Sequence, residues 1–239
     1  MGPGRAISSH RAEAGASSDS RAYDLLMGSP LILFSVFALA GFAIVIPQQW
    51  RGGSGNYPII LTEAVNAVFL GLQLVLVCTR RLPIAKAGGF RPRVWAFAGA
   101  NFGYALLLLP RVTLGAAMAG LSSLIVVTGT LGSVVALMWL GKGFSIFPQA
   151  RILVTGGPYT FVRHPLYLFE QWAMLGVALQ YRQPWALLLV AVSLCLQFPR
   201  MHYEEEVLAE TFAGYRDYKC ITPRLIPRFP LRKQSSSPE

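Results

Sequence analysis

Long apolar runs alternate with short polar segments along the chain, and the polar segments contain many of the glycines and prolines. Four of these runs approach the roughly 20 residues that an α-helix needs to cross a bilayer. They are Leu31–Ile46, Ile59–Val77, Val94–Leu109 and Met118–Leu140. Pro47 follows the first run and Pro110 the third, and proline disfavours continuation of a helix. The pattern therefore predicts four membrane-spanning helices within residues 25–140.

Two shorter apolar runs follow, Leu166–Leu179 and Trp185–Phe198, with the polar segment 180–184 between them. Each is short for a perpendicular crossing, and the brief connection predicts a tight helical hairpin. The expected fold class is thus all-α: a polytopic membrane helical bundle with four full spans plus a short C-terminal helical hairpin. The hairpin and the polar segments around it make residues 141–230 a second region.

The two ends of the chain lack apolar periodicity. Residues 1–24 are rich in Ser, Ala, Gly and Arg, and residues 231–239 are almost entirely polar. Such composition buries too little apolar surface to offset the entropy of ordering a chain. We expect both segments to be disordered tails.

Composition and charge indicate a membrane protein with a defined orientation. Hydrophobic residues make up 54% of the 239 and charged residues 13%, with a mean hydropathy of +0.47. If the N-terminus is cytoplasmic, all but Arg51, Arg111 and Arg182 of the 21 basic residues lie in cytoplasmic segments, as the positive-inside bias requires. Both termini and the loop Lys142–Arg163 are therefore predicted to face the cytoplasm.

The same composition argues against other classes of ligand. The net charge of +10 suits an anionic leaflet and calls for no nucleic-acid partner. Three scattered cysteines are too few for a disulfide framework or a zinc site, so we expect no metal centre. Membrane lipids are the expected surroundings.

Small residues recur at helical spacing in two of the predicted spans. Gly99 and Gly103 share one face of the third, and Gly129 and Ser133 share one face of the fourth. Such spacing lets a second helix approach closely. Asn101, between the first pair, is expected to hydrogen-bond across to a neighbouring helix.

The segment Leu153–Tyr167 concentrates the polar chemistry of the chain. Two glycines and two prolines, among them Gly157, Pro158 and Pro165, predict a shaped loop. Proline suits the first turn of a helix, so Arg163 and His164 would lie at the mouth of a helix that begins near Leu166. Free N–H groups and partial positive charge at that end favour an anionic ligand group.

A second polar cluster, Glu204–Glu206, follows the hairpin directly. Charge clustering alone favours a solvated helix start on the membrane face. Because both clusters emerge on the same side, the hairpin would bring Arg163 and His164 close to the glutamates. Cations beside carboxylates at a membrane surface suit a zwitterionic cofactor.

Six motifs in order carry a family resemblance over about the last 100 residues. They are Gly141–Ser145, Leu153–Tyr159, Val162–Tyr167, Glu204–Leu208, Tyr215–Tyr218 and Pro223–Pro227. This order resembles the isoprenylcysteine carboxyl methyltransferase family and its phospholipid-methyltransferase relatives. The resemblance implies that residues 141–230 form a catalytic region with a cytoplasmic pocket for S-adenosylmethionine. It also implies a tunnel from the membrane for a lipid-like or small hydrophobic acceptor.

The resemblance implies roles for individual residues. The cofactor-binding set is Leu153, Val154, Gly157, Pro158, Tyr159, Arg163, His164, Pro165, Tyr167, Glu204 and Glu205. Within it, Arg163 would hold a carboxylate of either the cofactor or the acceptor, and Glu204 and Glu205 an ammonium or ribose hydroxyls. The expected catalytic residues are Arg163, Glu170 and Glu205. An amine or thiol acceptor would need a general base, for which His164, His202 and Glu170 are candidates.

Methylation of an isoprenylcysteine-type carboxylate is the favoured function, and two alternatives remain. Arg163-His164-Pro165 followed by Glu170 also resembles a pattern of NADPH-dependent membrane steroid and sterol reductases, although Leu166 stands where that pattern has asparagine. A non-enzymatic membrane scaffold is the second alternative. The segment Phe212–Tyr215 is one residue shorter than the methyltransferase pattern. The acceptor, the atom methylated and the oligomeric state stay open.

Overall fold

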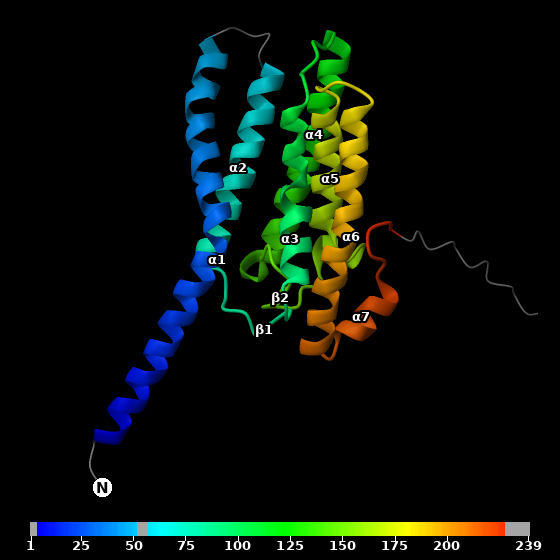
Figure 1. The fold of residues 1–239 in the computed structure, drawn as a ribbon. Coiled ribbons are helices and arrows are strands. Elements are labelled where there is room, and N and C mark those ends of the chain that lie inside the picture. Colours follow the sequence, from blue (N-terminus) through cyan, green and yellow to red (C-terminus); the bar gives the residue numbers. More distant parts are fainter. Residues whose placement is uncertain (1–3, 52–56, 228–239) are drawn as a thin grey trace, which may run out of the picture.

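The protein is a bundle of helices with a small polar cap at one end (Figure 1). The computed structural model describes residues 4–51 and 57–227, with side chains from residue 21 onward except that of residue 58. The α-helices are α1 (Gly4–Arg51), α2 (Tyr57–Thr79), α3 (Arg91–Asn101), α4 (Ala116–Leu140), α5 (Pro165–Ala178), α6 (Trp185–Thr211) and α7 (Tyr215–Ile221). The 3-10 helices are η2 (Phe102–Leu108), η3 (Gly141–Gly143) and η4 (Gly157–Thr160). Strands β1 (Ala85–Lys86) and β2 (Gln149–Ala150) pair antiparallel.

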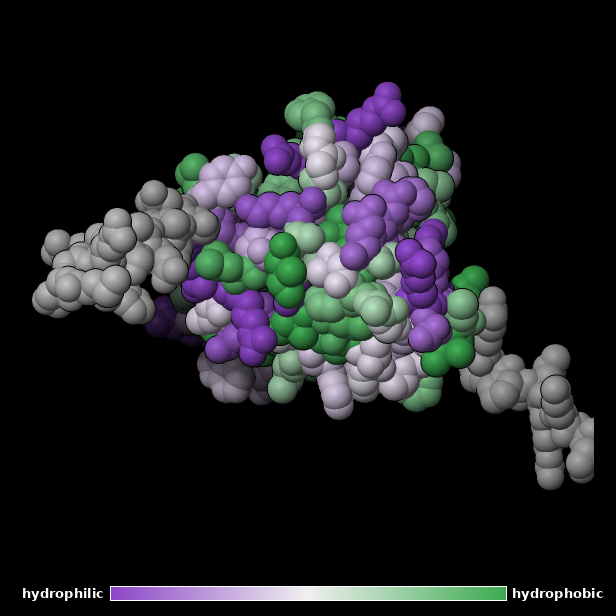
Figure 2. Space-filling view, turned by 90° about the horizontal axis from the view of Figure 1, so that it is seen from below, coloured by the Kyte–Doolittle hydropathy of each residue, from purple (hydrophilic) through white to green (hydrophobic). Residues whose placement is uncertain are grey.

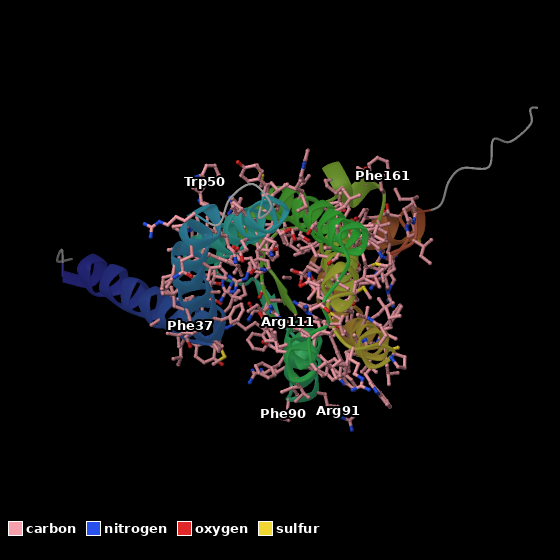
Figure 3. All side chains as sticks on the ribbon, turned by 90° about the horizontal axis from the view of Figure 1, so that it is seen from above. Phe37, Trp50, Phe90, Arg91, Arg111 and Phe161 are labelled. Atoms are coloured by element: carbon pink, nitrogen blue, oxygen red, sulfur yellow. The ribbon has the colours of Figure 1, made fainter. Side chains whose placement is uncertain are left out.

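Among the residues that the structure describes, four helices are long and apolar enough to cross a membrane. They cover Arg21–Arg51, Ile59–Thr79, Ala116–Gly143 and Trp185–Thr211. The prediction of an all-α, multi-pass membrane bundle is therefore confirmed. Large apolar side chains stand on its outer surface, where Phe37 is 81% exposed and points away from the helices (Figure 3).

The third predicted span is not one long helix. Its first part forms α3, and the chain then tightens into η2 before Pro110. Gly103, a poor helix former, lies at this change. A Cβ added at Gly103 would lie 2.9 Å from the sulfur of Met174. A 3-10 helix rises about 2.0 Å per residue against 1.5 Å for an α-helix, so α3 and η2 together cover about 30 Å.

The predicted hairpin has one short arm and one long arm. α5 has 14 residues, as expected, but α6 has 27 and continues through Pro199 instead of ending near Phe198. The segment after Pro199 contains four Glu together with Met201, Leu208 and Ala209, residue types that favour helix, and α6 continues through it although proline removes one backbone hydrogen bond. Glu204–Glu206 thus lie on the extension of a membrane-length helix.

The N-terminal helix also differs from expectation. α1 begins at Gly4 and runs through Pro30 and Pro47 to Arg51, whereas the sequence suggested a tail up to residue 24 and a stop at Pro47. Asp24 is only 2% exposed, which gives this part of α1 a fixed contact with the rest of the protein. The expected tail 231–239 lies outside the described residues.

Small residues bring α4 and α5 into close contact, as predicted from Gly129 and Ser133. A Cβ added at Gly129 would lie 2.5 Å from the backbone nitrogen of Ala173. Ser122 further donates a hydrogen bond to the carbonyl of Gly176 at 2.8 Å. The α4–α5 pair therefore forms a rigid base for the loop that connects the two helices.

In the third predicted span, the close helix contact expected at Gly99 is confirmed. The hydrogen bond from Asn101 to a neighbouring helix is not. Gly99 packs against α6, where the Gln197 amide donates to the Gly99 carbonyl at 2.9 Å. Asn101 instead donates to the carbonyl of Phe97 in its own helix. This side-chain hydrogen bond stays within α3 and does not bridge helices.

The polar segments gather at one end of the bundle, at the bottom of Figure 1. The Arg81 N–H donates to the Lys142 carbonyl, and β1 pairs with β2 there. At the opposite end Arg111 forms a bridge with Tyr181, next to Arg182. The separation of basic segments that the sequence predicted is thus present in three dimensions.

Candidate functional site

The candidate site lies at the polar end, where the N-terminus of α5 meets the last turns of α6. η4 and α7 flank these two elements (Figure 1). Seen from below, this end shows hydrophilic residues around an apolar centre (Figure 2). The two sequence clusters that we expected to meet do meet here.

The loop before α5 is held against α4 by a glycine. Gly157 has a φ of +59°, a left-handed conformation that side chains with a Cβ rarely adopt. A Cβ there would lie 2.4 Å from the indole of Trp139. Gly157 begins the single turn of η4, with Pro158 as its second residue, and this turn buries Tyr159. Glycine is therefore required for both backbone conformation and packing.

Tyr159 links the loop to two helices. Its hydroxyl donates to the Ala136 carbonyl at 3.4 Å, and its own carbonyl accepts from the Tyr218 hydroxyl at 2.6 Å. Burial raises the pKa of Tyr159, so its hydroxyl stays protonated and able to donate at neutral pH. The loop is thereby fixed between α4 and α7.

Glu205 is the centre of a buried charge cluster. Its side chain is 1% exposed and lies within 3.2 Å of nitrogen atoms from four residues. These are Arg163 and His164 at 3.1 Å, Lys219 at 3.2 Å and Arg224 at 2.8 Å. The hydrogen bond to Glu205 raises the pKa of Arg224, which stays charged. A carboxylate so surrounded is neutralised by the protein itself.

Arg163 is equally committed to protein partners. Its Nε and Nη2 approach Glu205, while Nη1 donates to the carbonyls of Lys219 and Thr222 at 2.8 and 3.2 Å. The Arg163 backbone N–H donates to Pro223, and that of His164 to Arg224. These two backbone N–H groups, just before α5, are thus used by the segment after α7 and are not free for an anion.

Glu204 differs from its neighbour. It is half-buried and accepts a hydrogen bond from the Tyr167 hydroxyl at 2.6 Å, and it forms no ion pair with a described residue. The His164 ring stacks on Tyr167, with centroids 5.4 Å apart and planes 7° apart. Glu204 is therefore the carboxylate of the pair whose charge remains available to a ligand.

A pocket with about 330 Å³ of open space lies beside these groups. Its lining residues are Leu140, Phe144, Ser145, Tyr159, Arg163, His164, Leu166, Tyr167 and Glu204. Five of the expected site residues are among them. Of the other four, Phe144, Ser145 and Leu166 lie in motifs that carry the resemblance but were not assigned to the site, and Leu140 was not anticipated.

The remaining expected residues lie outside the lining of this pocket. Gly157, Pro158 and Pro165 shape the backbone beside it, and Glu205 lies behind Arg163 and His164. The other members of the expected set, Leu153, Val154 and Glu170, do not line it. Their assignment stays a prediction.

Arg200 is a polar residue of the interior that the sequence analysis did not single out. It is 5% exposed, and its guanidinium lies over the Tyr167 ring, 4.5 Å from the centroid. Its contacts to Gln197 and to the Ile146 carbonyl are long, at 3.4 and 3.3 Å, and its Nε has no described partner. The sequence feature that could have identified Arg200 was its position four residues, or about one helical turn, before Glu204.

Comparison with known proteins connects this geometry to a family. Residues 110–214 match the phospholipid methyltransferase family. The cobalt-zinc-cadmium resistance protein CzcN of Cupriavidus metallidurans is 30% identical over 121 residues, 48% of this chain and 55% of the relative. The nickel-cobalt-cadmium resistance protein NccN of Alcaligenes xylosoxydans xylosoxydans is 27% identical over 121 residues, 49% of this chain and 56% of the relative.

A fungal enzyme is also similar. The phosphatidyl-N-methylethanolamine N-methyltransferase of Neurospora crassa is 32% identical over 97 residues, 41% of this chain and 44% of the relative. The chain spans about half the length of the curated relatives it matches. The matched region includes α4, α5, α6 and every residue that lines the pocket. This part of the chain is therefore similar to the phospholipid methyltransferase family and to a membrane methyltransferase of that kind.

Proposed function

We propose that the protein is an integral membrane methyltransferase that uses S-adenosylmethionine and acts on a lipid-like or small hydrophobic acceptor. The observation that carries this proposal is the pocket in which His164, just before α5, and Tyr167, in the first turn of α5, meet Glu204 of α6. It lies within the segment that matches the phospholipid methyltransferase family.

The residues of the pocket fit a zwitterionic methyl donor. When bound, S-adenosylmethionine supplies an electrophilic methyl group on a positively charged sulfur. The free charge of Glu204 suits its ammonium group or ribose hydroxyls, and Tyr159 and His164 add polar and aromatic contacts. Glu205, neutralised by its neighbours, instead holds Arg163 and His164 in place. Leu153 and Val154 remain candidates for contacts to the adenosine.

The acceptor is proposed to carry a carboxylate on an apolar body, as in isoprenylcysteine. Leu140, Phe144 and Leu166 give the pocket an apolar side that suits such a body. The guanidinium of Arg200 lies over the Tyr167 ring, and its Nε has no described hydrogen-bond partner. Its positive charge suits an acidic head group. A carboxylate reacts without losing a proton, so alignment and exclusion of water supply much of the rate.

A second acceptor class is the amine head group of a phospholipid. The match to the phospholipid methyltransferase family and to the Neurospora enzyme favours it. An amine must lose a proton before attack, and Glu170, on α5 about one turn beyond the pocket-lining Leu166 and Tyr167, is the proposed general base in that case.

Two measurements test the proposal. Calorimetric titration should detect binding of S-adenosylhomocysteine and none of NADPH; binding of NADPH alone would support a reductase instead. Methyl transfer from labelled S-adenosylmethionine is then measured with a farnesylcysteine analogue and with phosphatidyl-N-methylethanolamine. A product whose label is released by base is an ester, and a base-stable product is an N-methyl lipid. Heat-treated protein serves as the blank.

A further inference from the structure

A second pocket lies on the other side of the polar end, away from α5 and α7. It has about 360 Å³ of open space between the middle of α1 (Tyr23 and Met27), the segment around β1, the start of α3 and the segment that leads into β2. Met27, Pro92 and Phe147 give it an apolar wall, and Lys86 and Arg93 supply positive charge. No carboxylate is among its lining residues.

The two cations of this pocket are uncompensated. Neither Lys86 nor Arg93 forms an ion pair within the part of the chain that the structure describes, and both side chains are exposed. Lys86 rests over the ring of Tyr23, with Nζ 4.9 Å from the centroid, a contact that leaves its N–H donors free. The electrostatics of the pocket therefore favour an anion.

The nearest buried acid is already committed elsewhere. Asp24 accepts from Arg80 Nε at 2.8 Å and from Arg151 Nη2 at 2.5 Å, and all three side chains are buried. It therefore does not neutralise Lys86 or Arg93. The same contacts tie α1 to the segments after α2 and β2, so the walls of the pocket are held in place.

The position of the pocket is that of a lipid head group. The candidate spans begin at Arg21 in α1 and end at Thr79 in α2, so Tyr23 and the β1 loop stand where apolar spans give way to polar segments. Exposed apolar and basic side chains alternate around it: Ile84 is 66% and Phe90 78% exposed. Phe90 and Arg91 point outward from the foot of α3 (Figure 3).

From this geometry we propose that the pocket binds the phosphodiester head group of an anionic glycerophospholipid from the adjoining leaflet. Lys86 and Arg93 bind the phosphate, and the apolar wall receives the start of the acyl chains. The site is separate from the proposed methyl-transfer pocket, and its lipid is a bound partner rather than an acceptor.

Direct lipid binding by the full-length protein in a neutral detergent tests this site. Fluorescent phosphatidylglycerol is the probe, with phosphatidylcholine and inorganic phosphate in parallel. The wild type should bind phosphatidylglycerol at least tenfold more tightly than phosphatidylcholine. Lys86→Gln with Arg93→Gln should weaken binding about tenfold to thirtyfold, since each basic residue near an anionic surface contributes about a factor of five.

Matched variants separate this site from diffuse surface charge. Lys142→Gln with Arg216→Gln removes the same charge from exposed positions outside the pocket and should change affinity less than twofold. Ala87→Leu keeps all charges but fills the pocket, and it should weaken binding as well. Three results would each overturn the proposal. They are an equal loss of affinity in both double variants, equal affinity for phosphatidylglycerol and phosphatidylcholine, and competition by inorganic phosphate as strong as that by unlabelled phosphatidylglycerol. The assay needs no methyl donor, so its outcome is independent of the proposed reaction.

Discussion

At the scale of single residues, neighbouring glutamates have opposite surroundings. Glu205 points into the protein and meets Arg163, His164, Lys219 and Arg224, whereas Glu204 meets the Tyr167 hydroxyl at the edge of the pocket. Successive residues on a helix project about 100° apart, so identical side chains in sequence face different surroundings. One carboxylate therefore organises the site, and its neighbour is free to bind a ligand.

Glu204→Gln should weaken S-adenosylhomocysteine binding about tenfold without lowering thermal stability. The reason is loss of one charged hydrogen bond, which is worth about 1.5–3 kcal/mol. Glu206→Gln is the matched control because Glu206 is exposed and, within the described part of the chain, its ion pair is with exposed His202 at 3.1 Å. Calorimetry with S-adenosylhomocysteine on the wild type, Glu204→Gln and Glu206→Gln checks this. Equal affinities in all three proteins would remove Glu204 from the binding site.

Arg163→Lys should lose most of the affinity for S-adenosylhomocysteine although the charge is kept. The Arg163 guanidinium joins Glu205 to the carbonyls of Lys219 and Thr222, and one ammonium group cannot reach all three in that geometry. We expect a loss of tenfold or more, together with a lower Tm. Arg216→Lys on the exposed face of α7 is the control. Wild-type affinity in Arg163→Lys would show that this bridge is dispensable.

At the scale of elements, the α4–α5 contact determines where the loop between these helices can go. Gly129 and Gly132 on α4 face Ala173 and Phe169 on α5. Close approach of two helices in a membrane depends on such small residues, because lipid offers no hydrophobic driving force between them. The pocket lies at the end of this contact, where the loop returns over Trp139.

Gly129→Ala should destabilise the protein, because the new Cβ would lie 2.5 to 2.8 Å from the atoms of Ala173. Overpacking of this kind costs about 1–3 kcal/mol. Gly120→Ala on the same helix meets nothing within 4 Å and should be neutral or slightly stabilising. Thermal unfolding in detergent compares the pair, and equal Tm values would mean that α4 and α5 pack less closely than described.

At the scale of the whole molecule, charge separates the two ends. The end that carries both pockets also carries the basic loops, and Arg111 and Arg182 lie at the other end. From the positive-inside bias we predict that both pockets face the cytoplasm. In the proposed reaction, an acceptor from the membrane would reach the site from the side of the bundle. A water-soluble donor would reach it from the aqueous phase at the polar end.

Accessibility labelling checks this orientation. Cys78, Cys195 and Cys220 are all exposed, so they are first replaced by serine to remove background. A single cysteine at exposed Thr155 should then react only after the cytoplasmic side is opened to the reagent. A cysteine at exposed Arg182 should react in intact cells. The reverse pattern would invert the proposed topology.

Much of the fold and part of the site could be predicted from sequence. The apolar runs determined the helical membrane class, and the motif order indicated the superfamily. Gly129 predicted the close helix contact, and the loop from Tyr159 to Tyr167 predicted the main lining of the pocket. These features are local or periodic, so neighbouring residues are sufficient to specify them.

Other features depended on the tertiary structure. The length of α6, the break between α3 and η2, and the burial of Asp24 depend on contacts between distant segments. The same holds for the commitment of Arg163 to Glu205 and to carbonyls after α7. The sequence by itself determined which side chains are available for chemistry. Only the fold decided which charges are neutralised internally and which remain for ligands, because ion pairing depends on distances in space that composition and spacing do not contain.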